Sequence, residues 1–143
     1  MVIPLVIWGL VHEFAIAQSG DSTQPFRIDR PLAGRVGFEG IGLDLTLGGV
    51  VAIEGTSLLI YNAGKAKLLL LQKNATPFVG IGIGSLSAGP GGGSGKSWTV
   101  LLAGWQHDYE RLCFQFLVQL TVYKSPSYAS SPFPVSFEIG WRI

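Results

Sequence analysis

The sequence has few charges and almost no cysteine. Only 13% of its 143 residues are Asp, Glu, Lys or Arg, against about 25% in typical soluble domains. A single cysteine, Cys113, excludes an intramolecular disulfide and a cysteine-based zinc site. Ten Lys and Arg residues nearly balance nine Asp and Glu residues, whereas a nucleic-acid-binding protein carries a concentrated basic patch. With 48% hydrophobic residues, the chain is also too apolar to be disordered, and we expect no nucleic-acid partner.

The N-terminal apolar run is too short to be a transmembrane helix. Residues Val2–Val11 are almost wholly apolar, but a spanning helix needs about 18 such residues or more. The small residues of Ala15-Ile16-Ala17 follow, and the chain turns polar at Gln18. This order is typical of a secretory signal peptide. We predict a signal peptide over residues 1–17 and a single domain over residues 18–143; the alternative is a buried N-terminal strand or helix.

No stretch after Gly20 predicts a long amphipathic helix, because glycine recurs too often. Glycine supplies 20 residues, about twice its usual share of roughly 7%. Apolar and polar residues instead alternate over Leu112–Tyr123, Pro134–Ile143 and Thr76–Ser85, which indicates half-buried strands. Less regular candidate strands are Phe26–Arg30, Arg35–Leu47, Val50–Tyr61, Lys67–Lys73 and Trp98–His107. Eight short strands predict an all-β sandwich or closed barrel.

Connection lengths favour an up-and-down antiparallel barrel of about eight strands. Leu86–Ser97 and Lys124–Pro134 are long, while Asn74-Ala75 and Asp108–Arg111 are short. Outer-membrane barrels alternate short periplasmic turns with longer outward loops. We therefore expect both long loops to face outward and both termini to lie in the periplasm.

The composition of the polar face separates a membrane barrel from a soluble one. Small and neutral residues dominate this face, whereas a water-facing surface carries roughly 25–35% charged residues. A narrow lumen of eight strands is filled by such side chains. We expect Arg35 and Glu39 near the lumen, and aromatic girdles at strand ends from Trp98, Tyr109, Tyr123 and Trp141. The predicted polar network of the lumen is Gln115, Gln119, Glu138 and Arg142. The predicted lipid-facing side chains are Phe114, Phe116, Val118, Phe137, Ile139 and Trp141.

Two segments carry a resemblance to a known family. Pro134-Val-Ser-Phe-Glu-Ile-Gly-Trp-Arg-Ile143 resembles the terminal strand of small outer-membrane β-barrel proteins of the OmpA/OmpX-like type, and Thr76-Pro-Phe-Val-Gly-Ile-Gly-Ile-Gly84 resembles a recurrent strand of the same group. The resemblance covers roughly Phe26–Ile143 as a pattern. It implies a transmembrane barrel in a bacterial outer membrane, with membrane lipid as its partner.

Motifs that could carry chemistry are weak. Pro90–Ser97 lies one residue from a phosphate-binding loop, but that loop needs glycine where Pro90 stands and a helix after it. His107 beside Asp108 could act as the catalytic residues of a lipid-modifying barrel enzyme. However, neighbours on a strand point to opposite faces, and we expect this segment to be a solvated turn. A lone histidine provides no zinc site. We therefore expect no catalytic residue, no cofactor and no metal.

The sequence predicts a non-enzymatic outer-membrane barrel with a structural or surface-interaction role. Its lumen should be plugged, because eight strands leave no room for an open aqueous pore. One alternative is a secreted soluble barrel that carries a small apolar ligand, with Phe114, Phe116, Val118, Phe137 and Ile139 lining its pocket. The other alternative is a lipid-modifying barrel enzyme that uses His107.

Overall fold

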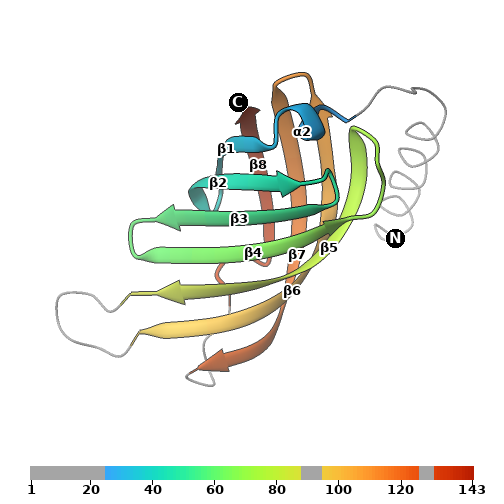
Figure 1. Ribbon diagram of the computed structural model, residues 1–143. Helices are drawn as coiled ribbons and strands as arrows, with labels where there is room; N and C mark the ends of the chain where they lie inside the picture. The colour runs from blue at the N-terminus through green and yellow to red at the C-terminus, as the bar shows by residue number, and fades with distance from the viewer. Residues whose placement is uncertain (1–24, 88–94, 126–130) are drawn as a thin grey trace, which may run out of the picture.

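The fold is a closed antiparallel barrel of eight strands, in which each strand pairs with its sequence neighbours and β8 closes on β1 (Figure 1). The computed structural model describes residues 25–87, 95–125 and 131–143. The strands are β1 (Leu32–Gly37), β2 (Gly40–Leu47), β3 (Val51–Leu58), β4 (Tyr61–Leu69), β5 (Ala75–Leu86), β6 (Lys96–Tyr109), β7 (Leu112–Ser125) and β8 (Val135–Arg142). The predicted all-β, eight-stranded antiparallel barrel is thus confirmed.

The two ends of the barrel differ. One end, which we call the turn end, holds the short helix α2 (Phe26–Asp29), the C-terminus and the turns after β2, β4 and β6. The other end, the loop end, holds the turns after β1 and β3 and the connections after β5 and β7. The middle of each long loop (88–94 and 126–130) and the predicted signal peptide (1–17) lie outside the described residues. No helix in the described part of the chain is long and apolar enough to cross a membrane.

Three predicted strands are wrong or have wrong bounds, although the strand count is right. The predicted strand Lys67–Lys73 overlaps β4 only over residues 67–69. Phe26–Arg30 does not form a strand but contains α2. The single predicted strand Arg35–Leu47 is in fact the hairpin of β1 and β2. This hairpin turns just before Gly40, whose φ of +113° suits glycine. A Cβ at Gly40 would also lie 2.3 Å from the Ser57 carbonyl oxygen, so the chain can reverse here only with glycine.

Strict alternation of exposed and buried side chains runs along β2 and β8. In β2 the outward side chains are Ile41, Leu43, Leu45 and Leu47, and the buried positions are Gly40, Gly42, Asp44 and Thr46. Part of the interior is an apolar core, formed by Ala52, Tyr61, Leu69, Phe78, Trp98, Val100, Leu102 and Leu117. The rest of the interior is polar and charged.

Candidate functional site: the charged interior of the barrel

The described part of the chain encloses ten charged residues inside the barrel. Five are cations and five are anions, so their formal charges cancel. Strands supply most of them, whereas Arg27 comes from α2 and Glu39 from the turn after β1. Burying an unpaired charge costs several kcal/mol, so every one of these groups needs a partner. The cations are Arg27, Arg35, Lys65, Lys67 and Arg142, and the anions are Glu39, Asp44, Glu54, Asp108 and Glu138.

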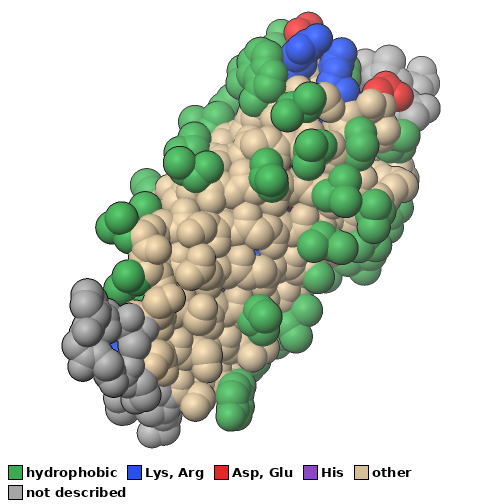
Figure 2. Space-filling model, turned by 60° about the vertical axis from the view of Figure 1, so that its left-hand side comes forward, with side chains coloured by type: hydrophobic (Ala, Val, Ile, Leu, Met, Phe, Trp, Pro, Cys, Tyr) green, Lys and Arg blue, Asp and Glu red, His purple; other side chains and the backbone are tan. Residues whose placement is uncertain are grey.

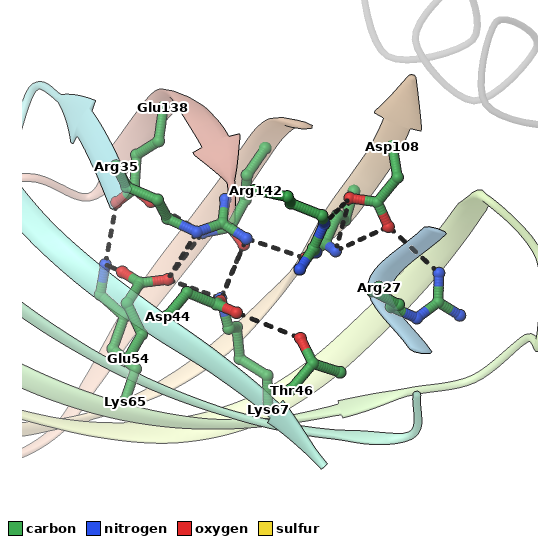
Figure 3. Close-up of polar contacts among 12 residues, drawn as sticks. Arg27, Arg35, Asp44, Thr46, Glu54, Lys65, Lys67, Asp108, Glu138 and Arg142 are labelled. Atoms are coloured by element: carbon green, nitrogen blue, oxygen red, sulfur yellow. Dashed lines mark hydrogen bonds and ion pairs between the residues drawn. The ribbon is translucent and has the colours of Figure 1, made fainter. Parts of the chain in front are cut away.

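Lys67 is the centre of the interior network. Its Nζ lies 2.9 Å from the Asp44 carboxylate and 2.8 Å from the amide oxygen of Gln115, and it also contacts Glu54. Arg35 donates to the same Asp44 oxygen at 3.0 Å. Figure 3 shows these side chains converging from different strands. Two cations therefore share one carboxylate, and Lys67 joins β2, β3 and β7 through side-chain contacts.

Lys65 extends the network toward the loop end. Its Nζ lies 2.8 Å from Glu54, 2.8 Å from Glu39 and 3.2 Å from Glu138. Glu39 also accepts a hydrogen bond of 2.8 Å from the Tyr61 hydroxyl. Nearer the loop end the interior is aromatic. The Tyr61 ring stacks on the Trp98 ring, with 6.0 Å between the ring centroids.

Phe133 contributes to this aromatic cluster from the segment before β8. Its ring meets Tyr61 edge-on at 5.2 Å, and Trp98 is only 2% exposed. Tyr61 and the aromatic cluster thus cover the loop-end side of the charge network.

Arg27 of α2 closes the turn end. Its guanidinium donates to the carbonyl oxygens of Gly49 at 2.9 Å and of Leu71 and Lys73 at 2.6 Å each. It also lies 3.3 Å from Asp108. Burial lowers the pKa of Arg27 from its ordinary value, and the Asp108 carboxylate opposes that shift. One side chain thus ties the helix to two turns and to the end of β6.

The four predicted lumen residues all lie inside the barrel, but not in one cluster. Gln115 and Glu138 are joined by a hydrogen bond of 3.1 Å. Gln119 bonds Glu39 nearer the loop end. Arg142 lies near the turn end, where its Nε is 2.9 Å from Asp108. Arg35 and Glu39 are buried as expected.

Several members of the network were missed by the sequence analysis. Asp44, Glu54, Lys65 and Lys67 are all buried, yet their strands were assigned mixed faces or wrong boundaries. The signal that could have found them is parity, since Asp44 follows Gly42 in a strict alternation and Lys65 shares the face of Lys67.

The predicted short turn Asp108–Arg111 begins two residues too early, and the cluster His107–Glu110 is not the solvated turn that the sequence predicts. β6 continues to Tyr109, so the turn comprises only Glu110 and Arg111. Asp108 therefore points inward, 1% exposed, and accepts hydrogen bonds from Gln106 as well as from the two arginines. His107, its neighbour, is exposed on the outer face, so the two side chains form no catalytic pair.

The outer wall of the barrel is mostly apolar, in contrast to the charged interior. The six predicted lipid-facing side chains lie on it: Phe114 is half-buried, and the other five are 40–51% exposed, namely Phe116, Val118, Phe137, Ile139 and Trp141. Among the described strand residues, the exposed charges are Lys96 and Lys124, both beside the long loops. Figure 2 shows hydrophobic side chains projecting along the barrel, with charged side chains gathered at its upper end.

The side-chain positions in the barrel correct two expectations. The Phe114, Phe116, Val118, Phe137 and Ile139 side chains cannot line an internal ligand pocket, because they lie outside. Trp98 belongs to the interior rather than to an outer girdle, since Gly84 leaves room for its indole.

The remaining sequence motifs gain no support. Lys96 and Ser97 begin strand β6 rather than the helix that a phosphate-binding loop requires, and residues 90–94 of that motif lie outside the described chain. Within residues 25–87, 95–125 and 131–143, no three His, Cys, Asp or Glu side chains gather as metal ligands. Comparison of the chain with protein-family models, curated proteins and solved structures gives no match.

Proposed function

We propose that the chain is a bacterial outer-membrane β-barrel of the OmpA/OmpX-like type, with a non-enzymatic structural or surface-interaction role. The observation that carries this proposal is the inverted polarity of the barrel. Ten charges lie inside, while the exposed wall between the strand ends is apolar or neutral. In water such a wall would be a large exposed apolar surface, which soluble monomers avoid; in lipid it is the favoured surface.

The longer strands and the closure of the sheet suit a bilayer. A tilted strand needs roughly 9–11 residues to cross the hydrocarbon. Strands β4 to β7 have 9, 12, 14 and 14 residues, whereas β1 has 6 and β2, β3 and β8 have 8 each. Lipid offers no hydrogen bonds, so a spanning sheet must close on itself to pair its backbone groups. The pairing of β1 with β8 provides that closure.

The filled interior supports a structural role over transport. Charged residues, glutamines and an apolar core occupy the space between the strands, and a barrel of this size has no room for a separate aqueous channel. The long connections Leu86–Ser97 and Lys124–Pro134 are then the parts available to an extracellular partner.

The proposal is tested by partitioning and by placing a charge on the wall. The purified chain should need detergent to stay monomeric and should fold into lipid vesicles, with the heat-dependent gel mobility of a closed barrel. Ile81 is 51% exposed in the middle of β5, and Ile81→Arg should cost about 2–4 kcal/mol of folding free energy in vesicles if it lies near the bilayer midplane.

Ile81→Ala is the matched control, since it shortens the same side chain without adding charge. A chain that is monomeric in plain buffer, and that Ile81→Arg leaves equally stable, would show a soluble barrel and overturn the proposal.

A further inference from the structure

Two apolar hairpin tips stand side by side at the loop end. The turn after β3 exposes Leu58, Leu59 and Ile60, of which Leu59 is 94% exposed, and the turn after β1 exposes Phe38. A Cβ at Gly40 would lie 2.6 Å from the Leu58 Cβ, so the two turns are in contact. We call Phe38, Leu58, Leu59 and Ile60 the tip cluster.

The backbone of Leu59 is strained. Its φ of +52° lies in the left-handed region, which glycine, asparagine and aspartate adopt far more readily than leucine does. The leucine side chain is almost wholly exposed, so its burial in the barrel does not offset this strain. Leucine is thus unfavourable in water at this position and favourable in an apolar surrounding.

The outer face of the loop end changes from apolar to polar along an oblique line. Strand pairing aligns outward residues of β2 to β7 in rows, and in the row nearest the loop end the β2 member is apolar while the others are polar. In the next row the members are apolar or glycine up to β5 and polar on β6 and β7. The first row is Ile41, Ser57, Asn62, Ser85, Ser97 and Ser125, and the second is Leu43, Gly55, Gly64, Ile83, Thr99 and Tyr123.

The rim of the barrel at the loop end rises from β1 to β7. Gly37 at the end of β1 pairs with Glu138, and β8 continues beyond that pair to Val135. Val135 pairs with Val118, and β7 continues beyond that pair to Ser125. Because barrel strands are tilted and staggered, a flat boundary across the barrel crosses β7 well before its end and passes over the turn after β1. The oblique polarity line follows the same course.

Exposed charges and strand lengths agree with such a boundary. In the described residues, the turns after β1 and β3 expose no charged side chain, since Glu39 is buried. Strands β1, β2 and β3 have 6, 8 and 8 residues, fewer than the roughly 9–11 that cross the hydrocarbon. The turn end exposes Asp29, Glu110 and Arg111, so the missing apolar length lies at the loop end.

We propose that the tip cluster is embedded among the acyl chains of the outer leaflet, with Phe38 deeper than Leu59. The proposal rests on the membrane location proposed above. Ser57 and Asn62, a facing polar pair just below the tip of β3 and β4, put that hairpin near the lipid surface. Lipid is the occupant because a flat bilayer produces an oblique boundary over β2 to β7, whereas a protein partner on the tips requires polarity changes only there.

The test measures the accessibility of a nitroxide spin label on the full chain folded in vesicles, with Cys113→Ala removing the native thiol. Molecular oxygen is concentrated in hydrocarbon and a neutral nickel chelate in water, so the ratio of their collision rates with the label reports depth. Labels at Phe38→Cys and Leu59→Cys should favour oxygen, as a label at Ile81→Cys in the middle of the wall does, and the ratio should be higher at Phe38. A label at Ser125→Cys should favour nickel.

A charge at the tip gives a second readout. Aspartate and asparagine both tolerate the left-handed backbone, so Leu59→Asp and Leu59→Asn differ in charge but not in strain. Leu59→Asp should have a lower urea midpoint of unfolding in vesicles than Leu59→Asn. Ser125→Asp, at the end of β7, should leave the midpoint of the wild type unchanged.

A nickel-favouring label at either tip, with an oxygen-favouring label at Ile81, would overturn this inference and leave the proposed function standing. Tip labels shielded from both reagents would indicate a protein contact, such as a second copy, and would also overturn it. Equal midpoints for Leu59→Asp and Leu59→Asn would contradict the lipid contact at Leu59. A nickel-favouring label at Ile81 would overturn both proposals.

Discussion

Arg27 and Asp108 meet at 3.3 Å although 81 residues separate them in the sequence. Asp108 also holds Arg142 at 2.9 Å, so one carboxylate joins helix α2, the end of β6 and the end of β8. This contact is the link between the charge network and the segment that covers the turn end.

Removing the Arg27 side chain should weaken the barrel. Arg27→Ala deletes the donors to Gly49, Leu71 and Lys73 and leaves Asp108 with one cation instead of two. Breaking a buried ion pair costs about 3–5 kcal/mol, and the urea midpoint of unfolding in detergent should fall accordingly. Arg30→Ala is the control, because Arg30 lies three residues after Arg27 and its side chain is partly exposed. Equal midpoints for the two variants would contradict the role of Arg27.

Replacing Lys67 should destabilise the interior, and the loss should be partly reversible. Lys67→Met leaves Asp44 and Glu54 short of a cation and the interior with a net negative charge. The expected loss is about 3–5 kcal/mol. Adding Glu54→Gln to Lys67→Met makes the numbers of buried cations and anions equal again. The double variant should therefore be more stable than Lys67→Met alone in the same urea titration. Additive losses would show that the two side chains act independently.

A side chain at Gly84 should disturb Trp98. A Cβ there would lie 2.4 Å from the indole nitrogen, so Gly84→Val forces the ring to move and should cost about 1–3 kcal/mol through overpacking. The change should appear as a shifted tryptophan emission and a lower unfolding midpoint. At Gly55 nothing lies within 4 Å of an added Cβ, so Gly55→Val should leave the emission unchanged; a shift of equal size in both variants would argue against the contact.

Cys113 should be unreactive in the folded barrel. Its side chain is fully buried, and an added Cβ at Gly140 would lie 2.5 Å from its sulfur, which shows how tightly the thiol is enclosed. A maleimide should label Cys113 only after unfolding, whereas a Ser57→Cys variant places a thiol on the outer face and should react in the folded protein. Rapid labelling of native wild-type protein would indicate an interior open to reagents.

Strands with long, unbroken alternation could be predicted from the sequence, including β5 with its alternating glycines, whereas the bounds of β1, β2 and β4 could not. β7 and β8 were found with nearly correct bounds because the aromatic and aliphatic residues of each strand share one parity. The hairpin of β1 and β2 was merged into one strand, since Gly37 and Gly40 read as strand positions rather than as a turn.

Partners within the interior depend on register, which local patterns do not encode. Lys67 and Gln115 bond across 48 residues, and Gln119 and Glu39 across 80 residues. The sequence could assign Gln115 and Gln119 to the inner face, but only the closed barrel shows which charges they meet. Asp108 was missed for a simpler reason, because the end of β6 was placed too early.

The interior charges also affect the unfolded chain, because they break up its apolar segments. Eight of the ten enclosed charges lie in strands and interrupt what would otherwise be apolar segments, as Asp44 does in β2 and Glu54 in β3. Within the barrel strands, such interruptions leave the unfolded chain without the run of about 18 or more apolar residues that a spanning helix needs. The residues that hold the closed cylinder together are thus the same ones that let the chain remain in water on its way to the membrane.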